Sequence, residues 1–580
     1  MTPPPPRPTS TDPEALGFEM ASMVEWLSPR ELIDTGQRAV LSGLFGAYAD
    51  KRELLGALGV DPPQDVSDRA AVWIDYVADL GDGFDATYSV ASLLAAGKLD
   101  VAGVDGQPTT TTRGDVLVMG GDQVYPSASV ELYEQRLVGP YGAALPYTVT
   151  DHPTLYAIPG NHDWYDGLTA FLRVFGQGRF IGGWQTRQRR SYFAVQLPHR
   201  WWLWGLDIQF ETYIDAPQLD YFRRIAEERM QAGDEVVLCS AKPTWVGANT
   251  KEPESYAHLD FFERHVLTPV GARVRVALSG DAHHYVRYTE IDGDRQKITA
   301  GGGGAYLSAT HRLPPNLELP PAASRARGKT TPSAAYRMAA TYPDRETSQR
   351  LRWRVGGLPF DNRGFWRLVT ALHAWFSLAV LWWARSTGAG LTAELRDLTF
   401  GAAVARIATT PAASVVTALI LFGMLLFTKD HRWRWRLGLG LPHGIAHVLV
   451  AAGTITLAAN ALSRLPDALY LPAFVVASGI VGGLASCYVF AGYLLLADTT
   501  GHNTNELFAA ARIEDHKCFV RLHVAEEALT VYAIGVPKVA HRWRVRAGAS
   551  PEDSWLEPDG DELEPQLIEA PIRLERGVVG

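Results

Sequence analysis

Three stretches of similar form decide the fold of this chain: DVLVMGGDQVY (Asp115–Tyr125), TLYAIPGNHD (Thr154–Asp163) and VRVALSGDAHHY (Val274–Tyr285). Each is a short apolar run that stops at a glycine followed by Asp, Asn or His. VWIDYVADLGDG (Val72–Gly83) and EVVLCSAKPTW (Glu235–Trp245) have a related form. Short strands separated by helical stretches predict an α/β layered fold. In such sheets, functional side chains gather in loops beyond the carboxyl ends of the strands.

Length and charge limit the class of protein. The chain has 580 residues, which predicts two or three folded units. Its formal net charge of −9 argues against a protein that coats nucleic acid, so no nucleic-acid partner is expected. Cys239, Cys487 and Cys518 form no CxxC pair and require neither a disulfide framework nor a thiolate metal site. A reducing compartment is therefore acceptable.

Composition divides the chain into five segments. We expect a disordered, proline-rich lead followed by an amphipathic helical segment in residues 1–69. The α/β domain then covers 70–310, a polar linker covers 311–364 and an apolar membrane region covers 365–497. In residues 498–580, HKCFVRLHV and ALTVYAIGV alternate like strands and predict a small β unit, packed near the membrane or against the α/β domain.

The apolar region predicts a bundle of about four transmembrane helices. The expected spans are 365–384, 408–427, 440–462 and 469–497, each near the roughly 20 residues that cross a bilayer. Arg367 and His373 interrupt the first span, and buried helices of a large soluble domain are the alternative. His443 and His447 share a helix face; with His373 they could bind a heme or a metal, although interhelical hydrogen bonding is the favoured interpretation.

A basic loop predicts the orientation in the membrane. KDHRWRWR (Lys429–Arg436) joins the second and third spans and is short and strongly positive. Such loops lie in the cytoplasm. With an even number of spans, the α/β domain and the C-terminus would lie on that side too, in an integral protein of the plasma or inner membrane.

The polar residues at the strand ends suit phosphoester hydrolysis. That reaction needs cations that neutralise phosphoryl oxygens and make hydroxide available near neutral pH, often two ions about 3.5–4 Å apart. Oxygen and imidazole ligands suit Mn, Fe or Zn. Any one aspartate after a strand could simply cap a helix. A turn or helix-cap role is the favoured interpretation for Asp82 and Asp85. The candidate residues are Asp79, Asp122, Tyr125, Asn161, His162, Asp163, Asp281, His283 and His284.

In this order, the motifs resemble those of the calcineurin-like metallophosphoesterase superfamily, especially purple acid phosphatases. Their pattern runs DxG, GDxxY, GNH[D/E], His-x-Pro and GHxH, and the resemblance covers roughly Val72 to Tyr285. It implies an α-β-β-α sandwich that holds one or two ions, Mn, Fe or Zn, with Mg possible. Asp79 resembles the first-metal aspartate, Asp122 the bridging aspartate and Tyr125 a ligand of a ferric first metal.

The resemblance also assigns the remaining roles. His283 resembles a first-metal ligand and Asn161 the second-metal amide ligand. His162 resembles the histidine that contacts the phosphate and protonates the leaving group, while Asp163 would orient that histidine.

Two departures affect the second ion. Asp281 replaces the first histidine of GHxH, and Ala241-Lys242-Pro243 replaces His-x-Pro. The second ion is therefore expected to bind more weakly, or to be a hard ion such as Mn or Mg. Alternatively, the Lys242 ammonium would hold the phosphate directly, with His284 on the substrate side.

These features predict a membrane-anchored enzyme that hydrolyses a phosphate monoester or diester with the help of metal ions. Its expected partners are a phosphorylated small molecule or lipid head group, and membrane lipid. The alternative is a catalytically weak membrane sensor or scaffold that binds a phosphorylated ligand. A transporter with a regulatory domain is disfavoured by the small number of spans.

Overall fold

The chain forms two units, and the first is assembled from both ends of the sequence. The computed structural model describes residues 6–31, 62–148, 152–208, 213–328, 332–386, 391–430, 432–548, 550–560 and 562–576. The sheet unit comprises Met1–Val24, Thr35–Ser348 and Glu514–Gly580, and the helical unit comprises Glu25–Asp34 and Gln349–Ile513. The predicted amphipathic helix lies almost entirely in 32–61, outside the described residues.

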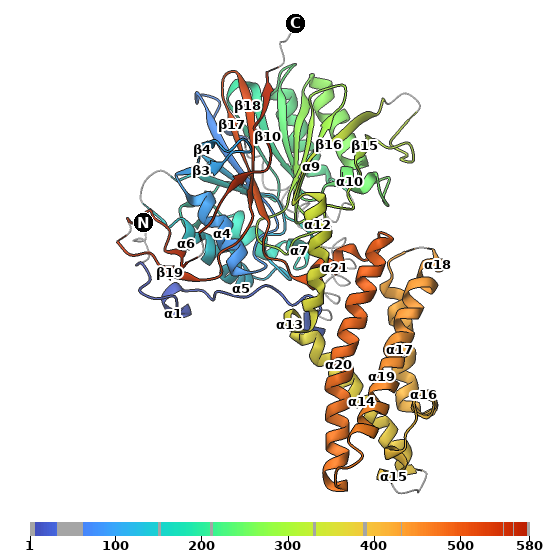
Figure 1. Cartoon of the computed structure of the whole chain (residues 1–580). Coiled ribbons are helices and arrows are strands. Elements are labelled where there is room, and N and C mark those ends of the chain that lie inside the picture. Colours follow the sequence, from blue (N-terminus) through green and yellow to red (C-terminus); the bar gives the residue numbers. More distant parts are fainter. Residues whose placement is uncertain are drawn as a thin grey trace. The chain divides into compact units, whose positions relative to one another are not determined.

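An eleven-stranded sheet carries three of the five motifs that end in polar loops (Figure 1). Strands β2 (Val72–Val77), β5 (Val116–Met119) and β6 (Thr154–Ala157) are parallel neighbours in it. β22 (Ile572–Glu575) pairs with β18 beside the main order. That order is β4 (Pro108–Thr112), β3 (Lys98–Ala102), β21 (Gln566–Leu567), β18 (Ala528–Val536), β17 (Lys517–Val524), β2 (Val72–Val77), β5 (Val116–Met119), β6 (Thr154–Ala157), β8 (Trp184–Thr186) and β7 (Phe180–Ile181).

A nine-stranded sheet carries the other two motifs, on the parallel strands β11 and β12. Its order is β1 (Gln64–Asp65), β9 (Phe193–Gln196), β10 (Trp201–Leu206), β11 (Glu235–Ser240), β12 (Arg273–Ser279), β14 (Gln296–Ala300), β13 (Tyr285–Glu290), β16 (Ala334–Tyr342) and β15 (Asn316–Leu319). β15 and β16 fall inside the predicted 311–364 linker, so that prediction is wrong for this stretch. Leu317, Leu319 and Tyr336 are buried there, between polar neighbours that hid the strand pattern.

Alternating side chains explain why these segments form sheets. Along β2, Val72, Ile74 and Tyr76 enter an apolar core that side chains of both sheets share. Val77 enters a second core, formed with helices such as α4 (Phe84–Ala95). The predicted α/β class is confirmed. Other helices of this unit are α1 (Pro13–Leu16), α5 (Val130–Tyr133), α6 (Gly139–Ala144), α7 (Asn161–Trp164), α8 (Thr169–Phe175), α9 (Ala216–Arg229), α10 (Thr244–Ala248) and α11 (Ala257–Phe262).

The C-terminal segment is an integral part of the sheet unit. β17 pairs with β18 on one side and with β2 on the other, so the predicted separate unit over 498–580 does not exist as such. Arg521 of β17 donates from Nε and Nη2 to the two carboxylate oxygens of Asp75 in β2, at 2.6 and 3.1 Å. Its Nη1 donates to Thr111. Sequence patterns identify strands but not partners so distant along the chain.

The N-terminal lead is ordered over residues 6–24, contrary to the prediction of disorder. Leu16 and Phe18 are buried in the core beside α4. The backbone N–H of Val24 donates to Asp82 at 2.9 Å, and Phe84 donates to the Ala21 carbonyl at 2.8 Å. A few apolar anchors among the prolines are sufficient to fix this stretch.

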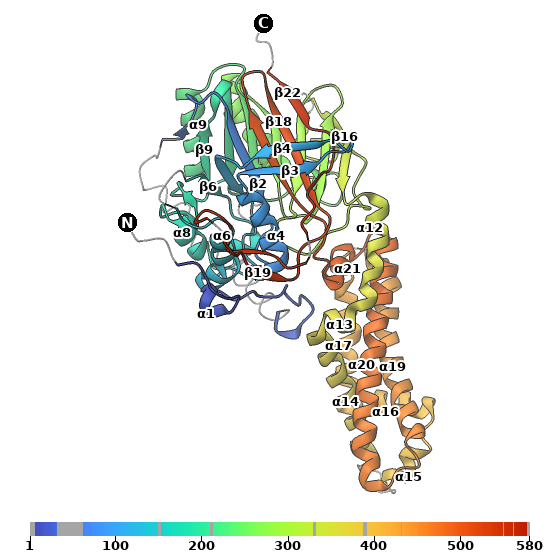
Figure 2. The same cartoon turned by 60° about the vertical axis from the view of Figure 1, so that its left-hand side comes forward.

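The helical unit exposes apolar side chains over its surface. Its helices are drawn in yellow to orange in Figure 2. Among the described residues, three helices are long and apolar enough to cross a membrane: Arg363–Arg385, Trp433–Ala461 and Asp467–Thr499. Leu419 is 65% exposed and Trp382 is 74% exposed, as expected of side chains that face lipid. The helices are α12 (Arg345–Leu351), which runs into this unit, α13 (Leu358–Asp361), α14 (Arg363–Ser386), α15 (Leu391–Arg396), α16 (Phe400–Thr409), α17 (Pro411–Phe427), α18 (Trp433–Trp435), α19 (Leu441–Ala461), α20 (Asp467–Thr499) and α21 (Thr504–Ala511).

The predicted span 408–427 differs from the structure. Helices α16 and α17 meet at a bend of 90°, and a fourth span exists only if this pair counts as one. Pro411 starts α17. Proline lacks a backbone N–H and is favoured at the first position of a new helix, which explains the break.

Three histidines in the helical unit form a hydrogen-bonded chain. His373 Nε2 lies 2.7 Å from the Ser486 hydroxyl, which lies 3.1 Å from His447 Nδ1. His447 Nε2 in turn lies 3.0 Å from His443 Nε2. These hydrogen bonds join α14, α19 and α20, in agreement with the interhelical hydrogen bonding that the sequence analysis favoured.

The buried Asp75–Arg521 pair generates a prediction about stability. Asp75 is 3% exposed and Arg521 is fully buried, so Arg521→Met leaves an uncompensated carboxylate in the core. We expect a loss of about 3–5 kcal/mol in the free energy of unfolding, measured by urea unfolding of the full chain. The matched control is Arg573→Met, which breaks the exposed pair with Glu527 and is expected to cost less than about 1 kcal/mol. Equal losses in the two variants would contradict this role of Arg521.

Candidate metal centre

The polar loops after four strands meet at one place between the two sheets. Asp79 follows β2, Asp122 follows β5, and Asn161 opens α7 after β6. Asp281 and His283 follow β12 of the other sheet. The loops touch through their backbones: the Asp281 N–H donates to Asp79 Oδ1 at 3.0 Å, and the His162 N–H donates to Asp122 Oδ1 at 2.8 Å.

The three carboxylate positions share an uncommon backbone conformation. Asp79, Asp122 and Asp281 have φ of 60°, 49° and 63°, in the left-handed region that few non-glycine residues adopt. Such positions cluster at functional sites, where the surrounding structure holds them. Close approach adds a further constraint, because a Cβ on Gly160 would lie 2.1 Å from Asp122 Oδ1, and one on Gly301 would lie 2.1 Å from Asp79 Oδ2.

The Tyr125 hydroxyl lies at the centre of the cluster. It is 3.2 Å from Asp79 Oδ1, 3.4 Å from Asp122 Oδ2 and 3.2 Å from His283 Nε2. His283 Nδ1 lies 2.8 Å from the Tyr306 carbonyl, which can only accept, so Nδ1 carries the proton. Nε2 therefore presents its lone pair to the cluster, as in metal-binding histidines whose other nitrogen donates to a carbonyl.

Burial shifts the pKa values of the carboxyl groups and of the imidazole in the site. Burial raises the pKa of Asp122 to about 7 and, together with repulsion from Asp122, the pKa of Asp281 to about 6. Burial and the same two carboxylates raise the pKa of Asp79 well above its usual range. Burial lowers the pKa of His283 to about 3, which keeps the imidazole in the neutral form that binds metals.

The cluster fits a cation. Asp79 Oδ2 is buried and has no hydrogen-bond partner in the described part of the chain. No lysine or arginine described in the structure forms an ion pair with Asp79 or Asp122; His283 Nε2 lies 4.0 Å from Asp79 Oδ1, but this imidazole is neutral. Buried carboxylates are normally paired or bound to metal. Carboxylate and tyrosine oxygens with an imidazole nitrogen suit Mn, Fe or Zn.

A second position lies beside this cluster, around a cavity of about 40 Å³ lined by Asn161, Ala241, Lys242 and Asp281. The cavity is where the two departures from the family pattern meet. Lys242 Nζ lies 3.4 Å from Glu252, and its charge opposes the rise in the pKa of Asp281. This arrangement fits two alternatives. The oxygens of Asn161 and Asp281 could hold a weakly bound ion, or the Lys242 ammonium could hold phosphate.

His162 is held differently from the expectation. Its Nδ1 lies 2.7 Å from the Pro126 carbonyl and therefore carries the proton, which leaves Nε2 as the nitrogen that can gain or lose one. Asp163 does not orient this imidazole. The Asp163 carboxylate accepts from the Tyr133 hydroxyl and from the backbone N–H groups of Gly160 and Gln123. It fixes the loop instead.

Other predicted residues also have structural roles here. His284 is 3% exposed and does not line the cavity beside Lys242. Asp82 accepts backbone N–H groups from Val24 and Tyr306, which fits a loop-holding role. Sequence reasoning missed Tyr133 and the carbonyls of Pro126 and Tyr306. Carbonyls carry no residue-specific signal, and Tyr133 lies outside every motif.

Comparisons with known proteins give a weak structural likeness. No family model and no curated protein matches the chain. GAP50, the anchor in the inner membrane complex of Plasmodium, is 12% identical over 41% of this chain and 74% of its own, with a TM-score of 0.30.

Two phosphatase-like structures are equally distant. A purple acid phosphatase from yellow lupin (Lupinus luteus) seeds is 11% identical over 49% of this chain and 51% of its own, with a TM-score of 0.30. PhoD is 11% identical over 43% of this chain and 59% of its own, with a TM-score of 0.26. The chain thus spans about half the length of the lupin enzyme. Scores this low carry no argument, so function must be argued from the site.

The cluster predicts that Asp122 is needed for metal content. Asp122→Asn keeps an oxygen that can accept the His162 N–H but removes the negative charge at the centre. We expect metal affinity to fall by at least about tenfold, since even changes beyond the ligands cost roughly 10–100-fold. Metal analysis of the purified full chain measures this. Asp292→Asn, at an exposed loop carboxylate, is the control. Unchanged metal content in Asp122→Asn would contradict the assignment.

Proposed function

We propose that the sheet unit hydrolyses a phosphate monoester or diester with the help of one or two metal ions. The single observation that carries the proposal is the buried cluster of Asp79, Asp122, Tyr125 and His283, in which burial raises the pKa of both carboxyl groups and keeps the imidazole neutral. The motif resemblance supports a place in the calcineurin-like metallophosphoesterase superfamily, with an α-β-β-α sandwich. The shared core between the two sheets supports that layering.

The residues divide between two ion positions. Asp79, Asp122, Tyr125 and His283 would hold the first ion, and Asp122, Asn161 and Asp281 the second. The metal is Mn, Fe or Zn, with Mg as the alternative for the oxygen-rich second position. Bound there, a metal supplies charge neutralisation of the phosphoryl oxygens and a nucleophile derived from water near neutral pH.

His162 is the proposed proton donor to the leaving oxygen. Its Nδ1–H is fixed on the Pro126 carbonyl, so Nε2 is the nitrogen that holds and transfers a proton. Its neighbour in sequence, Asn161, lines the cavity with Lys242. The charge of Asp281, which also lines that cavity, acts on the pKa of His162, so the imidazole would stand beside a phosphoryl group bound there. Burial lowers the pKa of His162, and an anionic phosphate nearby favours the protonated form.

Lys242 is the proposed phosphate-binding cation. Its ammonium reaches Glu252 at 3.4 Å and lines the cavity with Asn161 and Asp281. The substrate class is a phosphorylated small molecule or a lipid head group. His284, which is buried and whose carbonyl accepts from the Gly301 N–H, is proposed to support the loop rather than to touch substrate.

Membrane anchoring follows from the helical unit. Its three apolar helices have the length to span a bilayer, and a bent pair supplies a possible fourth span. We propose an integral membrane protein whose sheet unit and C-terminus face the cytoplasm, because basic residues concentrate in the loop Lys429–Arg436.

His162→Ala tests the proton-transfer role. Removing a general acid costs typically ~10²–10⁴-fold in rate. We expect a loss of this size for alkyl phosphate esters, a smaller loss for aryl esters with good leaving groups, and little change in phosphate binding. Steady-state rates on both ester types measure this split. His265→Ala, at an exposed histidine of the same unit, is the control.

Two outcomes would contradict this assignment. Equal losses of rate for the two ester types would show that His162 does not protonate the leaving oxygen. Absence of turnover by the wild-type chain on any ester, with Mn, Fe, Zn or Mg supplied, would favour the alternative of a sensor that binds a phosphorylated ligand.

The orientation is tested by reporter fusions. A reporter that is active only in the cytoplasm should work when fused after Gly580 and fail when inserted between Thr387 and Leu391. The expectation rests on the charge of the loop Lys429–Arg436 and on an even number of spans. The reverse pattern would place the site outside the cytoplasm. Activity at both positions would show that the number of spans is odd.

A further inference from the structure

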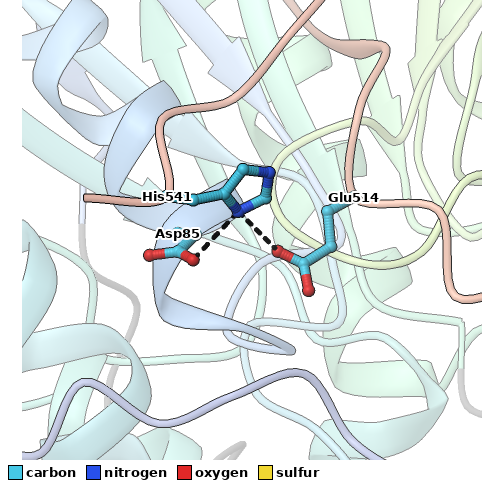
Figure 3. Close-up of side chains that lie close together, drawn as sticks. All are labelled: Asp85, Glu514 and His541. Carbon is cyan, nitrogen blue, oxygen red and sulfur yellow. Dashed lines mark hydrogen bonds and ion pairs between the residues drawn. The ribbon is translucent and has the colours of Figure 1, made fainter. Parts of the chain in front are cut away.

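A second cluster of potential metal ligands lies on the sheet unit, apart from the centre described above. Asp85 belongs to the first turn of α4, Glu514 precedes β17, and His541 follows β18. Figure 3 shows the His541 imidazole directed between the two carboxylates. One ligand atom from each residue lies within 4.8 Å of the other two.

Hydrogen bonding leaves this cluster incompletely satisfied. His541 Nδ1 lies 3.1 Å from Asp85 Oδ2 and 3.8 Å from Glu514 Oε2. A single N–H can donate well to only one of the two oxygens, and 3.8 Å is beyond hydrogen-bond distance. In the described part of the chain, the Glu514 side chain has no closer partner. Two carboxylates therefore approach one imidazole nitrogen that can serve only one of them.

We propose that Asp85, Glu514 and His541 bind a divalent cation, Zn²⁺ in particular. Calcium and magnesium prefer sites built only from oxygen, whereas one imidazole and two carboxylates suit zinc. Ligand atoms of a tetrahedral zinc are about 3.3 Å apart, given Zn–N and Zn–O bonds of about 2.0–2.1 Å. Here the imidazole nitrogen lies 3.1 and 3.8 Å from the two carboxylate oxygens, and all three atoms lie within 4.8 Å of one another, so side chains that are 25% to 54% exposed would have to move closer together to bind the ion. This exposure leaves room for water as a fourth ligand.

A neighbouring tryptophan supports the ligand role of Asp85. Trp543 Nε1–H donates to Asp85 Oδ1 at 3.0 Å, while Oδ2 faces His541. One carboxylate oxygen is thus fixed by a hydrogen bond and the other is directed toward the cluster. Outer partners of this kind orient ligating carboxylates.

The ion would link segments that are far apart in the sequence. Glu514 and His541 flank β17 and β18, two of the four strands that the C-terminal segment adds to the large sheet, and Asp85 follows the loop that carries Asp79 and Asp82. Zinc would thus fasten the C-terminal segment to the start of α4. This role is independent of the proposed hydrolysis.

Zinc binding by the purified full chain tests the proposal. The background variant is Asp122→Asn, so that ions at the proposed catalytic centre do not mask the result. After chelation, zinc addition and desalting, we expect one equivalent of bound zinc and a rise in the thermal unfolding temperature, because a ligand of the folded state stabilises it. Adding His541→Ala or the isosteric Glu514→Gln should remove both effects. Adding His265→Ala, at an exposed histidine elsewhere, should remove neither.

The outcomes separate this proposal from the proposed function. If metal at Asp122 were wrongly assigned, Asp122→Asn would leave the metal content unchanged, yet His541→Ala would still remove one equivalent. Zinc content that is the same with and without His541→Ala and Glu514→Gln would overturn the proposal. The three residues would then form an ion pair only.

Discussion

The buried ion pair between Asp75 and Arg521 joins the two ends of the sheet unit. It forms where β17 pairs with β2, so the central strand of the large sheet has its neighbour supplied from beyond the helical unit. The chain leaves the sheet unit after Ser348 and re-enters it at Glu514. Because β2 ends at Val77 and Asp79 lies two residues further on, the strand that positions the first carboxylate of the site depends on this late pairing.

Within the sheet unit, one buried aspartate is paired with an arginine and two others are not. Asp75 is neutralised by Arg521 at 2.6 Å, whereas no arginine or lysine within the described ranges pairs with Asp79 or Asp122. Burial raises the pKa of both unpaired groups. The fold places an arginine on one buried carboxylate yet leaves the carboxylates around Tyr125 without one, which is consistent with the proposed binding of a cation from solution. This contrast links the fold to the proposed chemistry.

The sequence predicted the motif loops because glycine and polar residues after apolar runs are local signals. Asp79, Asp122, Tyr125 and His283 do meet, as their order along the chain suggested. The pairing of β17 with β2 could not be predicted, since alternation gives a strand but not its partner. The support of His162 by a carbonyl was equally hidden, because every residue carries one. Asp163 was assigned the wrong role because its position next to His162 in the sequence does not show where its carboxylate points.

The measurement that tests the metal centre most directly is anomalous X-ray scattering from crystals of the full chain, recorded at the absorption edges of Mn, Fe and Zn. The account predicts an anomalous peak among Asp79, Asp122, Tyr125 and His283, with a second and weaker peak beside Asn161 and Asp281 if both ions bind. Density without an anomalous peak at this cluster, in crystals grown with these metals, would contradict the account.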